Sequence, residues 1–158
     1  MPTDIAHFID GARAPGRSGR TVPSYNPATG EETGRVHLAS TAEVDATAAC
    51  AKHAFPKWAA TPPLRRARIL NRFLRIVEER IDELAAVITA EHGKVLSDAK
   101  GEIQRGMEVV EFATGASQLL KGEITENVGT RVDSHALRQP LGVVAGITPF
   151  NFPVMVPM

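Results

Sequence analysis

Residues 140–158, PLGVVAGITPFNFPVMVPM, decide the fold of this chain. The stretch contains no charged residue and is long enough to cross a bilayer as a helix. Proline recurs through it, at positions 140, 149, 153 and 157. Because proline lacks the backbone donor and clashes inside a helix, we do not expect this stretch to form a membrane-spanning helix.

Within that stretch, residues 141–147 (LGVVAGI) form an apolar run rich in β-branched side chains. Such a run is typical of a strand that is buried on both faces of a parallel sheet. We therefore expect a buried strand here, followed by a loop that begins at Thr148 and Pro149.

Asn151 is the one strongly polar side chain of the loop, and it lies between Phe150 and Phe152. We expect it to be buried and hydrogen-bonded, because an unpaired amide in apolar surroundings is costly. Two interpretations stay open: the amide satisfies the backbone of a turn, or it donates to a reacting oxygen.

The composition favours a cytoplasmic protein with no nucleic-acid or membrane partner. Lys and Arg total 18 and so do Asp and Glu, which leaves no strong electrostatic field. Residues 1–10 lack the basic and apolar parts of a secretion signal. The single cysteine, Cys50, excludes a disulfide framework and is expected to pack inside a helix. No His or Cys stands at metal-ligand spacing from His135, so no metal site is predicted.

Local signals predict most of the remaining elements. Asp10-Gly11 predicts a hairpin turn, and a strand is expected at 35–38. Ser40 and Glu43 form a capping-box pattern, which predicts a helix to about residue 55.

Two long helical patterns and a ribbon follow. Thr61 is expected to cap a helix with a break near residues 80–82, and Gly93 is expected to end it. Ser97 is expected to cap a second helix over 98–120. Weak alternation over 130–138 then predicts an exposed β-ribbon.

Arg105 on the second of these helices has two interpretations. Glu102 and Glu108 lie three residues to either side, so an exposed helix ion pair is the simpler one. A guanidinium also presents a planar fork that suits a substrate carboxylate.

The chain resembles the aldehyde dehydrogenases in several separated motifs that occur in the expected order. Residues 147–153, ITPFNFP, resemble the I-x-P-[WF]-N-F-P signature of that superfamily, and 25–31, 90–94 and 138–143 also resemble its conserved stretches. Residues 101–106 (GEIQRG) and 146–153 resemble the CoA-acylating methylmalonate-semialdehyde dehydrogenases. The resemblance covers only the N-terminal third of such enzymes.

The resemblance implies an α/β fold: the N-terminal part of an aldehyde-dehydrogenase-like Rossmann NAD domain. Residues 1–158 would form the N-terminal portion of this domain, with 124–140 as an oligomerisation ribbon of a homodimer or homotetramer. No G-x-G-x-x-G occurs in the chain, so the NAD assignment follows from the resemblance alone. In that family, the residues matching Thr148 and Phe150 contact the cofactor.

The chemistry implied by the resemblance is NAD-dependent oxidation of a small semialdehyde, with coenzyme A as co-substrate and propionyl-CoA or acetyl-CoA as product. A cysteine attacks the carbonyl, and Asn151 would donate to the resulting oxyanion. Arg105 would hold the substrate carboxylate. The family's nucleophile lies after the last residue of this sequence, so the 158 residues alone are expected to be inactive. The alternatives are a non-catalytic remnant, an oligomerisation module, a fragment of a non-acylating aldehyde dehydrogenase and a piece of a full-length enzyme.

Overall fold

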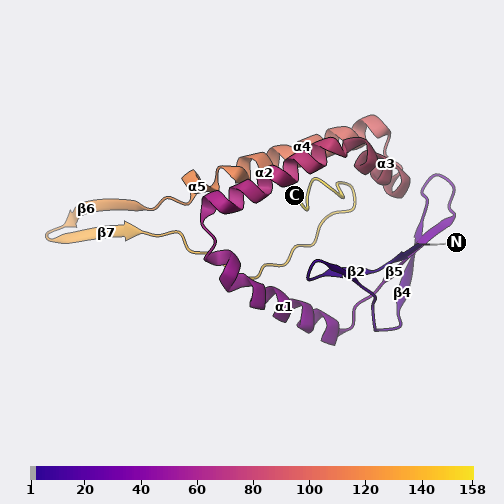
Figure 1. Cartoon of the computed structure of the whole chain (residues 1–158), viewed down its shortest axis with the longest axis horizontal. Helices are drawn as coiled ribbons and strands as arrows, with labels where there is room; N and C mark the ends of the chain where they lie inside the picture. The colour runs from indigo at the N-terminus through magenta and orange to yellow at the C-terminus, as the bar shows by residue number, and fades with distance from the viewer. Residues whose placement is uncertain (1–2) are drawn as a thin grey trace.

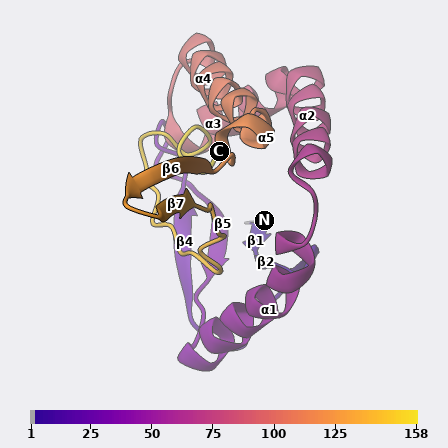
Figure 2. The same ribbon diagram turned by 90° about the vertical axis from the view of Figure 1, so that its left-hand side faces the viewer.

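The computed structural model describes residues 3–158, so the first two residues of the predicted domain 1–158 lie outside the description. The molecule combines helices with three small β units (Figure 1). Helices α2 (Pro63–Glu79), α3 (Ile81–His92) and α4 (Leu96–Thr114) pack together at one end of the molecule (Figure 2). Helix α1 (Thr41–Ala59) lies at the other end. The mixed α/β class predicted from the sequence is confirmed.

The N-terminal β units contain the predicted hairpin. Strands β2 (His7–Ile9) and β3 (Ala12–Ala14) pair antiparallel. Asp10 and Gly11 between them have φ of 54° and 74°, the left-handed backbone that a tight hairpin turn requires. A second sheet has the order β1-β5-β4, from β1 (Thr3–Ile5), β4 (Thr21–Tyr25) and β5 (Glu32–His37), and β5 contains most of the strand predicted at 35–38.

Helix α1 (Thr41–Ala59) begins at the predicted capping box. The Ser40 hydroxyl accepts from the Glu43 N–H, and the Glu43 carboxylate accepts from the Ser40 N–H. That backbone bond, together with a second from the Arg17 N–H, lowers the pKa of Glu43 to about 2. The helix continues past the predicted end near residue 55 and contains Pro56.

Helices α2 (Pro63–Glu79) and α3 (Ile81–His92) are separated at Arg80, which confirms the predicted break. Gly93, with a φ of 79°, ends α3 as predicted. The predicted cap at Thr61 is wrong, because Pro62 is the N-cap residue and the Thr61 hydroxyl instead donates to the Lys57 carbonyl oxygen at 2.8 Å. Pro63 is the first residue of the helix. Because proline has no N–H group, one fewer N–H at this helix start needs an acceptor, and a side-chain cap is less necessary.

Helix α4 (Leu96–Thr114) is followed, after Gly115, by the short α5 (Ala116–Leu119). The predicted cap at Ser97 is also wrong, since Val95 is the N-cap residue. The core lies where α4 packs against α2 and α3, and its buried residues are Val77, Ala85, Ile88, Ala99 and Ile103.

The predicted β-ribbon is confirmed as strands β6 (Glu123–Gly129) and β7 (Val132–Ala136), which pair antiparallel. Every residue of both strands is exposed, and the ribbon projects away from the helices (Figure 1). A role for residues 124–140 in oligomerisation stays a prediction.

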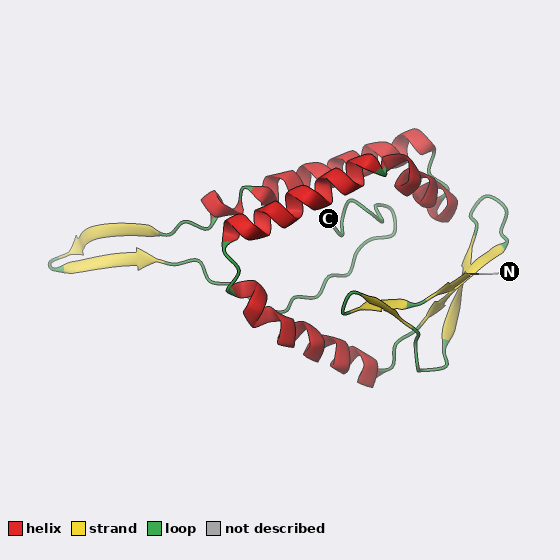
Figure 3. Ribbon diagram, viewed as in Figure 1, coloured by secondary structure: helices red, strands yellow, loops and turns green. Residues whose placement is uncertain are grey.

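The C-terminal segment, residues 137–158, contains no regular element and is drawn as loop in Figure 3. The prediction of a buried strand at 141–147 is therefore wrong for this chain: Leu141 is 94% exposed and Ile147 is fully exposed. A buried parallel strand needs hydrogen-bonded neighbours on both sides, and the sheet formed by β1, β4 and β5 does not extend to this segment. Farther on, Val154 and Met158 do pack on the helical core. Among residues 3–158, no helix is both long and apolar enough to cross a membrane.

Candidate active site

A hollow of about 450 Å³ lies between the N-terminal half of α4 and the C-terminal segment. It brings together Asn151 and Arg105, which are 46 positions apart in numbering and were both singled out from the sequence. The other residues lining it are His92, Lys94, Ser97, Asp98, Gly101, Glu102 and Phe152.

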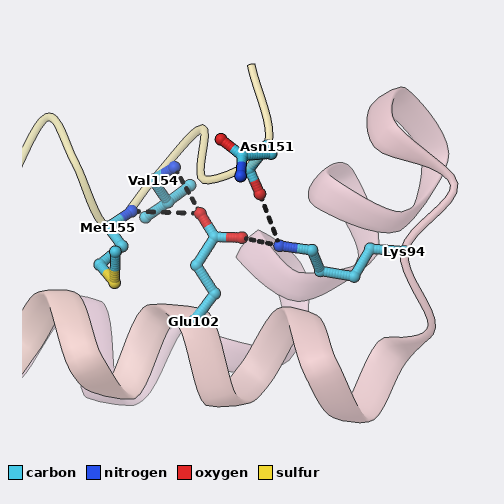
Figure 4. A network of polar contacts seen from close by, with 5 residues as sticks. All are labelled: Lys94, Glu102, Asn151, Val154 and Met155. Atoms are coloured by element: carbon cyan, nitrogen blue, oxygen red, sulfur yellow. Dashed lines mark hydrogen bonds and ion pairs between the residues drawn. The ribbon is translucent and has the colours of Figure 1, made fainter. Parts of the chain in front are cut away.

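Glu102 is the buried charged group of this site, with 2% of its surface exposed. Its position on α4 places it on the same face as the buried Ala99 and Gly106. One carboxylate oxygen, Oε1, accepts from the N–H groups of Val154 at 2.8 Å and Met155 at 3.1 Å. The other, Oε2, accepts from Lys94 Nζ at 2.6 Å (Figure 4).

Two opposing effects set the pKa of Glu102. Burial raises the pKa, but hydrogen bonds from Lys94, Val154 and Met155 stabilise the ionised form and outweigh it. The pKa is therefore held below the ordinary value for a glutamate, and the carboxylate is charged at neutral pH.

Lys94 connects this carboxylate to the loop that carries Asn151. It follows the left-handed Gly93, which ends α3 and turns the chain toward α4. Its ammonium group also donates to the Asn151 carbonyl oxygen at 3.0 Å (Figure 4). The same group lies 4.6 Å from the centre of the Phe152 ring. A cation over an aromatic face is favourable, so the ring further restricts where the ammonium group lies.

Asn151 is held by its main chain rather than by its side chain. The prediction of a buried Asn151 is wrong: the residue is exposed and lines the hollow, while its carbonyl oxygen accepts from Lys94 Nζ. Without the expected strand before it, the loop has no sheet to bury it. The hydrogen bond that Asn151 makes with Lys94 uses its main-chain carbonyl oxygen and not its side-chain amide.

Arg105 lies on the exposed side of α4 and lines the same hollow. The predicted ion pairs with Glu102 and Glu108 are not formed among the described residues. Glu102 directs its carboxylate to Lys94 and to the C-terminal segment instead.

Comparison with known proteins identifies the family to which this arrangement belongs. The aldehyde dehydrogenase family model matches residues 14–158. The chain belongs to the aldehyde dehydrogenase family. Its helices, ribbon and N-F-P loop are thus those of an aldehyde dehydrogenase, as the sequence motifs predicted.

Three relatives illustrate the similarity. Malonate-semialdehyde dehydrogenase 3 of Geobacillus kaustophilus is 50% identical over 153 residues, which are 97% of this chain and 32% of that protein. The human mitochondrial methylmalonate-semialdehyde/malonate-semialdehyde dehydrogenase [acylating] is 44% identical over 158 residues, 100% of this chain and 29% of that protein. A crystal structure of a candidate methylmalonate-semialdehyde dehydrogenase from Sinorhizobium meliloti 1021, complexed with NAD, is 51% identical with a TM-score of 0.94 and covers 99% of this chain and 32% of that one. The chain thus spans about a third of the length of the relatives it matches.

Thr148 and Phe150, the predicted cofactor contacts of this aldehyde dehydrogenase chain, do not line the hollow. Both are exposed, and the Phe150 ring, 86% exposed, stacks at 6.4 Å on the ring of His92. The contact of Thr148 and Phe150 with NAD stays a prediction.

Two residues of the site were missed in the sequence. Lys94 lies in one of the family-like motifs, which predicts no role for it, and the spacing along the helix predicts Glu102 only as a partner of Arg105. The available signal was the position of Glu102 in the stripe formed by Ala99, Ile103 and Gly106, where a charged side chain must find partners.

The single thiol of the sequence lies elsewhere. Cys50 is half-buried in α1 and is not among the residues that line the hollow.

Proposed function

We propose that this chain is the N-terminal segment of an NAD-dependent, CoA-acylating dehydrogenase that oxidises malonate or methylmalonate semialdehyde. The observation that carries the proposal is the hollow shared by Asn151 and Arg105. The substrate contains an aldehyde and a carboxylate a few bonds apart, so an amide donor and a guanidinium on one small hollow match its two ends. The names of the relatives support the same substrate class.

Asn151 acts on the aldehyde end. When a nucleophile adds to the carbonyl carbon, negative charge develops on the carbonyl oxygen, and a fixed amide N–H stabilises it more than it stabilises the substrate. The main-chain contact to Lys94 fixes the residue, and the side chain is left to donate.

Arg105 acts on the carboxylate end. Its guanidinium can donate two parallel hydrogen bonds to one carboxylate, which orients the substrate as well as binding it. A semialdehyde held at both ends loses rotational freedom before reaction, and this orientation contributes to the rate.

Thr148 and Phe150 would contact NAD, which supplies the hydride acceptor when bound. The NAD-complexed relative from Sinorhizobium meliloti supports this cofactor, and the word acylating in the name of the human relative supports coenzyme A as the acyl acceptor. The nucleophilic cysteine would come from the remainder of the enzyme.

Assembly into a homodimer or homotetramer through residues 124–140 is part of the proposal, and the full exposure of β6 and β7 supports it, because unpaired strand edges invite pairing. A cytoplasmic location is likewise proposed, from the sequence composition alone.

The experiment that tests the proposal is steady-state NADH formation by the full-length enzyme with methylmalonate semialdehyde, coenzyme A and NAD. Asn151→Ala should lower kcat by about a hundredfold or more, as removal of one oxyanion donor does in other enzymes. The matched control is Asn71→Ala on the exposed side of α2, which should retain the parental kcat. Unchanged turnover of Asn151→Ala, with chemistry rate-limiting, would remove Asn151 from the mechanism.

A further inference from the structure

Few contacts hold the loop that carries Asn151. Residues 137–158 form no strand or helix. Among the described residues, they make one hydrogen bond between main-chain groups, from the Val156 N–H to the Phe152 carbonyl oxygen at 3.4 Å. The loop must therefore be positioned by other groups if the Asn151 amide is to meet a reacting oxygen reproducibly.

We propose that Glu102 and Lys94 are positioning residues: the buried carboxylate on α4 and its ammonium partner hold the Asn151 loop at the distance from α4 that the reaction needs. This inference rests on the proposed role of Asn151 and adds the groups that set where its amide lies. Neither residue needs to touch the substrate's reacting atoms.

The geometry fastens the loop on both sides of Phe152. Upstream, Lys94 Nζ donates to the Asn151 carbonyl oxygen at 3.0 Å. Downstream, the N–H groups of Val154 and Met155 donate to Glu102 Oε1 (Figure 4). The 2.6 Å contact between Lys94 and Glu102 joins the two attachments into one network.

Burial makes this network rigid. The Glu102 side chain is 1% exposed and that of Lys94 is 13% exposed, so little water competes for either charge. Each charge is costly to bury alone, and together they favour the one arrangement in which both are paired. Because α4 is packed in the core through Ala99 and Ile103, the network attaches the loop directly to the helical core.

A purely structural role for the network is the alternative. It would change the amount of folded enzyme or its stability, but it would not depend on the presence of the Asn151 amide. A positioning role predicts that the effect of losing Lys94 vanishes once Asn151 has no amide left to position.

The test is a double-mutant cycle in the full-length enzyme with Lys94→Met, Asn151→Ala and the combined variant. Methionine retains most of the length of the lysine side chain and removes the charge and the donor. The readout is the single-turnover rate of NADH formation at saturating semialdehyde, with the NAD dissociation constant measured separately. We expect Lys94→Met to lower this rate at least about tenfold, as displacement of a positioned group does, while the NAD dissociation constant is unchanged. In the Asn151→Ala background, Lys94→Met should lower the rate no further.

The matched control is Lys100→Met, which removes a lysine of α4 from an ion pair with Asp82, outside the hollow. It should retain the parental rate in both backgrounds. If Lys94→Met does not fold, Glu102→Gln replaces it in the same cycle. The glutamine carbonyl oxygen can still accept from the Val154 and Met155 N–H groups, while its NH₂ group, a donor, faces Lys94 in place of the carboxylate oxygen.

Equal losses from Lys94→Met in both backgrounds, or no loss in either, would overturn the positioning role and leave the role of Asn151 intact. An unchanged rate in Asn151→Ala alone would overturn the proposed function of Asn151, and the positioning role with it.

Discussion

Replacing Glu102 by methionine should loosen the segment 152–158 at two identified amides. Methionine has a similar length and no strong acceptor, so the variant removes both carboxylate oxygens and leaves the α4 backbone in place. The amides that lose their acceptor are those of Val154 and Met155, which donate to Oε1 at 2.8 and 3.1 Å. We expect their hydrogen exchange in the full-length protein to accelerate.

The size of the effect follows from the hydrogen bonds. A hydrogen bond to a charged group contributes about 1.5–3 kcal/mol. Since about 1.4 kcal/mol changes an equilibrium tenfold, losing such a bond should raise the exchange rate of each amide about ten- to hundredfold. The larger value is favoured because Lys94 also loses its partner when the carboxylate is removed.

Hydrogen–deuterium exchange with mass spectrometry on peptides covering residues 152–158 measures this change. Glu108→Met, an exposed position on the same helix, is the control and should exchange at the parental rate. If peptides covering residues 152–158 exchange at the parental rate in the Glu102→Met variant, the Glu102 carboxylate does not hold this segment.

The pH dependence of the same exchange has a defined direction. The folded-state pKa of Glu102 lies below the ordinary value of 4.5, because the hydrogen bonds outweigh burial. The stabilisation by the carboxylate is therefore fully present above about pH 4.5 and is lost as the pH falls through the lower, folded-state pKa. After correction for the intrinsic exchange rate, the parental protein should approach Glu102→Met only at acidic pH, and a constant difference down to pH 2 would contradict the assigned ionisation.

Three further outcomes are expected. Arg105→Leu in the full-length enzyme should lower kcat/KM for methylmalonate semialdehyde far more than for propanal, which has no carboxylate; equal losses for the two would make Arg105 a structural residue. Gly106→Ala should lower the free energy of unfolding by about 1–3 kcal/mol, because the new Cβ would lie 3.2 Å from Met155 Cα and 2.5 Å from Met158 Sδ. Urea denaturation measures this change, and an unchanged unfolding midpoint would mean that residues 155–158 move away without a cost in free energy. The 158-residue chain alone should form no NADH, because its one thiol, Cys50, does not line the hollow; NADH formation that Cys50→Ser abolishes would contradict this.

The elements that could be predicted from the sequence are those whose structure depends only on a few neighbouring residues. The turn at Asp10-Gly11, the capping box of Ser40 and Glu43 and the helix end at Gly93 each depend on local backbone chemistry. The caps predicted at Thr61 and Ser97 were wrong because the N-cap residues are Pro62 and Val95, and sequence signals define a helix start only to within one or two residues.

Long-range structure explains the remaining errors. The apolar pattern at 141–147 is that of a strand, but a strand forms only where another strand pairs with it, and none among residues 3–158 does. In the site, the family-like motifs led to Asn151 and Arg105, which do share a hollow. The pairing of Glu102 with Lys94 was missed because it depends on the turn between α3 and α4, which sequence spacing along one helix does not reveal.

That pairing bears directly on the proposed role of Arg105. Spacing along α4 favours an ion pair between Arg105 and Glu102, and a guanidinium neutralised in this way would attract a substrate carboxylate weakly. Glu102 instead faces the core, and its two oxygens accept from Lys94, Val154 and Met155. One of the two glutamates that lie three residues from Arg105 is thus already paired with another cation and does not cancel the charge of Arg105. By binding the carboxylate that would otherwise compete with the substrate, Lys94 supports the proposed function of Arg105 as well as that of Asn151.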